Sequence, residues 1–151
     1  MKKHKSFTLI ELLVVIAVLA GFMALLVPNY MQMRTKSRDT RRKSDLRSIQ
    51  KALELYKLEQ VPPVYPATAS IVACQSISDA TNVYMQKIPQ DPLSQCGASV
   101  VSYSYLRNGS DSTKYTLCAC LENANDSEGE ASCYVGAPAC ASSKYYKLIE
   151  P

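Results

Sequence analysis

Residues 7–27, FTLIELLVVIAVLAGFMALLV, decide the architecture of this 151-residue chain. The stretch is 21 residues long, and its two polar side chains are Thr8 and Glu11. A helix of this length extends about 30 Å, the thickness of the hydrocarbon core of a bilayer. Because the stretch is apolar on every side, it predicts a helix that lies in lipid or is buried all round. A carboxylate is costly in such a segment, so Glu11 is expected to have a function.

The remaining sequence divides into a basic part and a mildly acidic part. Residues 1–60 contain 12 Lys and Arg against 5 Asp and Glu, whereas residues 61–151 contain 5 against 8. All six cysteines follow the apolar segment, which favours disulfides in an oxidising compartment over free thiols. No zinc site is expected, because there is no C-x-x-C pair and His4 is the single histidine. The cysteines are Cys74, Cys96, Cys118, Cys120, Cys133 and Cys140.

The residues after the apolar stretch predict a second, amphipathic half of the same helix. Pro28 removes a backbone hydrogen bond, so a kink is expected near it. The helix is expected to end near Glu59, because Val61-Pro62-Pro63 follows. Four apolar residues recur at intervals of three and four and must pack against the rest of the chain: Leu46, Ile49, Leu53 and Tyr56.

The basic residues between Arg34 and Asp45 are expected to form a solvated, charged face of this helix. Within them, Asp39 and Lys43 have the spacing and order of a favourable i,i+4 ion pair. Contact with anionic lipid or nucleic acid is the alternative. A nucleic-acid partner is not expected, because no aromatic residues are interleaved with these charges.

Residues 61–151 predict a small head with an antiparallel sheet. Loops with one or two helical turns, within Ser78–Lys87, are expected before the sheet. Val100–Leu106 and Lys114–Leu121 alternate as strands do, with Asn108-Gly109 in the loop between them, and so predict a hairpin. Ser132–Val135 and Tyr145–Ile149 are candidates for further strands. The predicted fold class is therefore α+β, with a long helix packed on a small sheet.

Alternation along the second strand suggests how the cysteines pair. Cys118 and Cys120 point to the same face, so both can meet the segment that carries Cys133 and Cys140. A third disulfide would then join the remaining two cysteines, Cys74 and Cys96. Six cysteines allow many connectivities, so this pairing is one hypothesis among several.

Residues 5–13, KSFTLIELL, after a short basic leader, resemble the class III signal of type IV pilins and type II secretion pseudopilins. The resemblance implies a pilin-like fold and cleavage between Ser6 and Phe7 by prepilin peptidase, which also methylates the new amine of Phe7. It implies that Glu11 guides assembly, and Pro28 lies where the family often has a proline. Ser6 departs from the family, which usually has Gly before the cut.

The resemblance also implies the organisation and the partners of the chain. The expected parts are a leader (1–6), a transmembrane and filament-core helix (7–30), an amphipathic basic helix (31–60) and a disulfide-rich head (61–151). Before assembly the chain would be a single-pass protein of the cytoplasmic membrane, with its apolar helix in contact with lipid and its head outside. It would then self-associate into a periplasmic or extracellular filament, with an inner-membrane assembly platform and an ATPase as partners.

Calcium is the one ligand that the resemblance suggests, because some pseudopilins bind it in a loop after the strands. The run 123–130 lacks the spacing of an EF-hand, so a solvated acidic loop is the alternative and no cofactor or metal residue is assigned. The acidic residues concerned are Asp91, Asp111, Glu122, Asp126, Glu128 and Glu130.

The function expected from these features is structural: a subunit of a type IV pilus-like filament or of a secretion pseudopilus. No enzyme is expected, because residues 7–151 contain no histidine, no G-x-S-x-G and no phosphate-binding loop. Two alternatives stay open at this point: a membrane-anchored binding module and a DNA-uptake (competence) pseudopilin.

Overall fold

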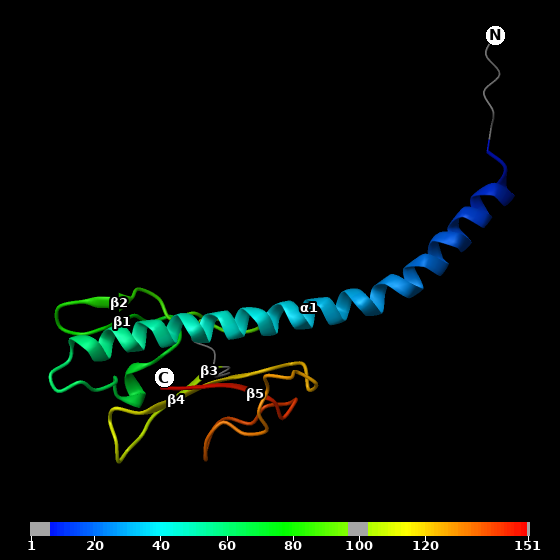
Figure 1. The fold of residues 1–151 in the computed structure, drawn as a ribbon. Helices are drawn as coiled ribbons and strands as arrows, with labels where there is room; N and C mark the ends of the chain where they lie inside the picture. Colours follow the sequence, from blue (N-terminus) through cyan, green and yellow to red (C-terminus); the bar gives the residue numbers. More distant parts are fainter. Residues whose placement is uncertain (1–6, 97–102, 151) are drawn as a thin grey trace, which may run out of the picture. The chain divides into compact units, whose positions relative to one another are not determined.

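The computed structural model describes residues 7–96 and 103–150 (Figure 1). The chain divides between Thr35 and Lys36 into two compact units. A single helix, α1 (Leu9–Glu59), contributes to both units. The predicted leader, 1–6, and residues 100–102 of the predicted first strand lie outside the described residues. The helix ends at Glu59, as the prolines that follow it predict.

The first unit extends to Thr35 and contains the apolar part of α1. This part is long and apolar enough to cross a membrane, and none of its most apolar residues is buried in the structure. It is therefore not the core helix of the described chain. The helix is continuous through Pro28, and the kink expected there stays a prediction.

In the second unit, an antiparallel sheet of order β3-β4-β5 is formed by β3 (Tyr103–Arg107), β4 (Tyr115–Cys120) and β5 (Tyr145–Ile149). Leu117 of β4 is the register partner of Tyr105 in β3 and of Leu148 in β5. The predicted hairpin and the predicted strand at β5 are thus confirmed. Together with α1 they make the α+β fold that the sequence predicts.

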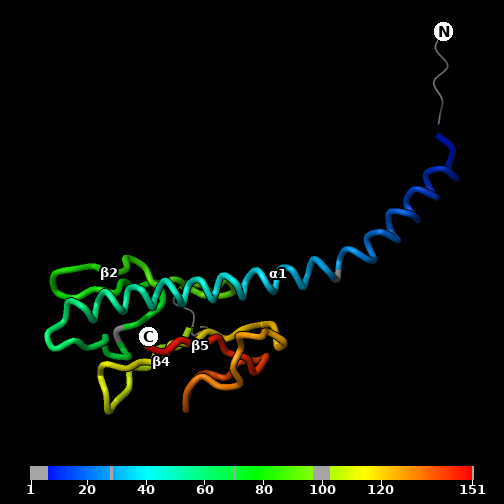
Figure 2. Tube along the Cα trace, in the orientation of Figure 1, coloured from blue at the N-terminus to red at the C-terminus, as the bar shows by residue number. Residues whose placement is uncertain are grey.

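Two details of the predicted head are wrong. A two-stranded antiparallel pair, β1 (Ile77–Ser78) and β2 (Val83–Met85), replaces the helical turns expected there. Within residues 61–96, the one helical segment is η1 (Thr68–Ser70). Residues 132–135 form no strand. The trace in Figure 2 follows this segment as an irregular loop between β4 and β5.

The core of the second unit lies where the C-terminal half of α1 meets both groups of strands (Figure 1). Leu46, Ile49 and Leu53 are at most 1% exposed, which confirms the predicted apolar face. On one side, the ring of Tyr56 packs edge-on against Tyr84 of β2, with 5.3 Å between centroids. On the other side, the three buried helix residues join the sheet residues in one cluster, and burial of such side chains supplies most of the stability of a small head.

Three disulfides close the irregular parts of the head. Two of them, Cys118–Cys133 and Cys120–Cys140, tie β4 to the segment that leads to β5. The third, Cys74–Cys96, closes the region around β1 and β2. This arrangement agrees with the pairing hypothesis from strand alternation, and all six cysteines are paired. Cross-links of this kind stabilise a head that has few regular elements.

Candidate functional site

Thr8 and Glu11 form a reciprocal cap at the start of α1. The backbone N–H and the hydroxyl of Thr8 donate to Oε2 of Glu11, at 2.9 and 2.8 Å. The backbone N–H of Glu11 donates in return to Oγ1 of Thr8, at 3.3 Å. This geometry is a capping box, whose signature is Ser or Thr followed three residues later by Glu or Gln. Thr8 is a candidate functional residue that the sequence analysis missed, although the T-x-x-E spacing is its signal.

The cap gives Glu11 a partner within its own chain. A carboxylate at a helix N-terminus is favoured by the helix dipole, and the cap satisfies backbone N–H groups that have no partner inside the helix. Both bonds from Thr8 end on Oε2, so Oε1 of the same carboxylate can accept a further donor. Phe7, immediately before the cap, is 83% exposed. The start of the helix therefore presents an anion beside an accessible residue 7.

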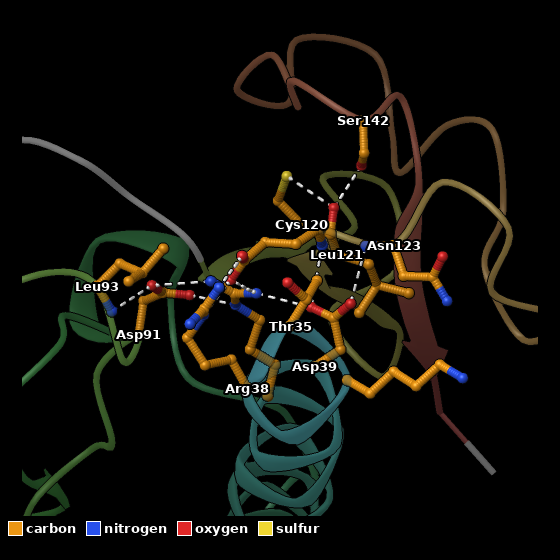
Figure 3. Close-up of polar contacts among 12 residues, drawn as sticks. Thr35, Arg38, Asp39, Asp91, Leu93, Cys120, Leu121, Asn123 and Ser142 are labelled. Carbon is orange, nitrogen blue, oxygen red and sulfur yellow. Dashed lines mark hydrogen bonds and ion pairs between the residues drawn. The ribbon is translucent and has the colours of Figure 1, made fainter. Parts of the chain in front are cut away.

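A second cluster of charges lies on α1 within the second unit and is centred on the buried side chain of Arg42. Figure 3 labels three of its members, Arg38, Asp39 and Asp91. The guanidinium of Arg42 donates through Nε and Nη2 to both oxygens of Asp91, at 2.5 and 3.2 Å. Through Nη1 it donates to Asp39 and Glu122, both at 2.7 Å. Arg38 donates to Glu122 through Nε and Nη2, at 2.7 and 2.5 Å. The cluster joins the helix to the loop after β2 and to the segment after β4.

Asp39 also fixes the backbone that follows β4. Its two carboxylate oxygens accept the backbone N–H groups of Glu122 and Asn123, each at 2.9 Å. Asp39 is 2% exposed and Arg42 is 3% exposed. The prediction of a solvated charged face is therefore wrong for these two residues. The predicted ion pair between Asp39 and Lys43 is also wrong, because Asp39 pairs with Arg42 while Lys43 reaches Asp126.

The charges around Glu122 predict an acid-sensitive head. Hydrogen bonds from Arg38 lower the pKa of Glu122 from 4.5 to about 2, with burial opposing the shift and Arg42 reinforcing it. Because the pKa is lower in the folded protein, this stabilisation is complete above the unfolded value and is lost as the pH falls from 4.5 toward 2. It amounts to about 3 kcal/mol or less, because solvent screens a side chain that is 26% exposed.

Thermal unfolding measured between pH 7 and pH 2.5 tests this expectation. Glu122→Gln removes the titrating group, so the variant is expected to lose less stability than the wild-type protein on acidification. Equal losses in the two proteins would contradict the assignment of this acid sensitivity to Glu122.

The acidic residues considered for calcium are engaged by cations of the chain itself. Each carboxylate lies within ion-pair distance of a basic side chain: Asp91 and Glu122 of Arg42, Asp126 and Glu128 of Lys43, Asp111 of Lys114, and Glu130 of Lys147. Among residues 7–96 and 103–150, no group of three or more His, Cys, Asp or Glu is arranged to hold a metal ion.

The structure places the remaining predicted site residues in separate parts of the molecule. Phe7 and Glu11 lie at the start of α1, and Pro28 lies within the same helix. The six cysteines belong to the head. Ser6 lies outside the described residues, so the cleavage site stays a prediction.

Comparison with known proteins matches both parts of the chain. Residues 1–27 match the family model of the prokaryotic N-terminal methylation motif, and residues 29–133 match that of type II secretion system (T2SS) protein G. No solved structure matches the chain.

Three relatives named type II secretion system core protein G illustrate the similarity. That of Klebsiella pneumoniae is 35% identical over 101 residues, which is 61% of this chain and 71% of the relative. That of Pectobacterium carotovorum is 30% identical over 97 residues, 60% of this chain and 62% of the relative. That of Vibrio cholerae serotype O1 is 28% identical over 121 residues, which is 75% of this chain and 77% of the relative. Because the protein G family model matches residues 29–133, more than half of this chain, the chain belongs to the type II secretion system protein G family.

Proposed function

We propose that this chain is a structural subunit of a type II secretion pseudopilus, cleaved and N-methylated by prepilin peptidase before assembly. The observation that most supports the proposal is the succession of an N-terminal methylation motif (1–27) and a protein G match (29–133) along one chain. The protein G match favours secretion over the pilus, the competence pseudopilin and the anchored binding module. In this role the chain needs no catalytic residues.

The exposed apolar half of α1 suggests two successive environments for the subunit. Before assembly the helix lies in the cytoplasmic membrane, with the head on the periplasmic side, where its disulfides are stable. In the filament the same helix is buried among the helices of other copies. Such contacts join different surfaces of neighbouring subunits, so they generate an open fibre rather than a closed ring.

Glu11 has a specific part in this assembly. Cleavage before Phe7 creates a positive amine at the start of the helix. A neighbouring subunit, displaced along the filament axis, can place its amine against the carboxylate of Glu11, which already accepts two bonds from Thr8. Water is scarce in the helical core, so the attraction is strong and each charge offsets the desolvation cost of the other.

A shearing experiment tests the proposed function. The chain is expressed with a type II secretion system whose own core protein G gene has been deleted, and the cells are sheared and fractionated. We expect fibres that contain this chain in the sheared fraction and restored export of a secreted substrate. A chain found only in the membrane fraction, without export, would contradict the proposal, provided that the deleted gene restores both when it is returned.

Ser6, the residue before the proposed cleavage site, leads to a prediction about cleavage of the leader. Ser is small enough for a narrow peptidase cleft but lacks the backbone freedom of Gly, so Ser6→Gly is expected to preserve or speed cleavage. Ser6→Leu is expected to leave the leader attached. Mass spectrometry of the membrane-extracted protein gives the N-terminal residue and its methylation. A wild-type protein that still begins at Met1 would contradict cleavage before Phe7.

A further inference from the structure

The segment between β4 and β5 includes an acidic loop, residues 121–130, that is bound by a lysine from α1. Nζ of Lys43 lies 2.7 and 2.9 Å from the two oxygens of Asp126 and 2.9 Å from Oε2 of Glu128. The side chains of Lys43 and Asp126 are 15% and 16% exposed. One ammonium group thus lies against a mostly buried carboxylate, that of Asp126, and against the carboxylate of Glu128, whose side chain is 53% exposed.

The electrostatics of this contact favour the charged form of both partners. Burial alone would lower the pKa of Lys43, but hydrogen bonds with Asp126 and Glu128 outweigh it and raise the pKa. For Asp126 the signs are reversed: burial alone would raise its pKa, but the hydrogen bond from Lys43 outweighs burial and the pKa is lowered. Nζ of Lys43 also lies 5.5 Å from the ring centre of Tyr146 in β5, a favourable distance for a cation–π contact.

The rest of the loop is held by further contacts within the chain. Glu130 and Tyr145 exchange two backbone hydrogen bonds, at 2.7 and 2.8 Å. Nζ of Lys144 donates to the carbonyl of Gly129, at 3.2 Å. The disulfides Cys118–Cys133 and Cys120–Cys140 close the chain around the loop. Glu122 and Glu130 of the loop pair with other cations, Arg38 and Arg42 for the first and Lys147 for the second. Asp126 and Glu128 are the two carboxylates of the loop that pair with Lys43.

We propose that the ammonium of Lys43 takes the place of a bound divalent cation in this head. The loop then folds and stays folded without calcium, the ligand that the family resemblance suggests. The proposal concerns the stability of the head and does not depend on the filament function. Its physical basis is that an ammonium carried by the helix offsets the negative charge of Asp126 and Glu128 at any concentration of free ions, whereas stabilisation by a bound ion depends on the concentration of that ion.

Thermal unfolding of the full chain, extracted in detergent, tests the proposal. The wild-type midpoint is expected to agree within about 1 °C between excess EDTA and millimolar CaCl2. Lys43→Met is expected to lower the midpoint in EDTA by about 5 °C, because Asp126 and Glu128 lose their counter-charge. The matched control is Lys51→Met, an exposed lysine on the same helix, which is expected to leave the midpoint unchanged.

Calcium added to the Lys43→Met protein distinguishes a replaced cation from an ordinary ion pair. The freed carboxylates of Asp126 and Glu128 are expected to accept calcium, so CaCl2 should recover part of the lost midpoint in this variant alone. Three results would overturn the proposal: a saturable rise of the wild-type midpoint with calcium, a Lys43→Met protein as stable as the wild type, or a destabilised variant that calcium does not stabilise.

Discussion

Replacing Arg42 with Met is expected to destabilise the head by about 3–5 kcal/mol, because it removes the shared cation from a buried cluster. Asp39 and Asp91, which are 2% and 5% exposed, would then lose the guanidinium that pairs with their carboxylates. Of the two arginines that bind Glu122, Arg38 would remain. A typical domain is stable by only 5–15 kcal/mol, so this loss is a large fraction of the total. The variant should unfold at a much lower temperature and be degraded in cells.

Two further variants separate the charge of Arg42 from its geometry. Arg42→Lys keeps a positive charge but cannot pair with both oxygens of Asp91 as a planar fork, so an intermediate loss is expected. Arg41→Met is the matched control, because Arg41 is the neighbouring residue on α1 and is exposed. Unfolding midpoints of the detergent-extracted proteins measure all three. An Arg42→Met protein as stable as the Arg41→Met control would show that the cluster contributes little.

The parts of this fold that could be predicted from the sequence are those with a strong local pattern. The apolar stretch and the Leu46–Ile49–Leu53 face predict α1, and the prolines after Glu59 predict its end. Alternation predicts β4, where the same pattern also places Cys118 and Cys120 on one face. In each case the signal lies within about ten residues of the feature that it predicts.

The parts that could not be predicted depend on contacts between distant segments. The strands β1 and β2 have two and three residues, too few to show an alternating pattern, and β2 is packed against the helix through Tyr84. The burial of Arg42 requires Asp91 and Glu122, which are 49 and 80 residues away along the chain. The local i,i+4 rule therefore gave the wrong partner for Asp39.

The second large effect is expected at Glu11, where a conservative variant separates two roles of one carboxylate. Glu11→Gln removes the charge but can still form the capping box with Thr8, because Gln is the alternative residue at that position. We expect the variant to insert in the membrane and be cleaved normally, since neither step uses the charge. Sheared filament is expected to fall at least about tenfold, because the loss of an ion pair in a water-poor core exceeds 1.4 kcal/mol.

A substitution of Thr8, the partner of Glu11 in the capping box, tests the cap by itself. Thr8→Val keeps the shape of the side chain and the charge of Glu11 but removes the hydroxyl, which donates to Oε2 and accepts the N–H of Glu11. Loss of a cap costs about 1 kcal/mol, so this variant should reduce filament yield less than Glu11→Gln does. If instead Thr8→Val abolishes sheared filament while Glu11→Gln assembles normally, the carboxylate acts as a helix cap and the neighbouring amine is not its partner. Glu11→Ala removes both the cap and the charge, so its filament yield is the lower reference for the yields of Thr8→Val and Glu11→Gln.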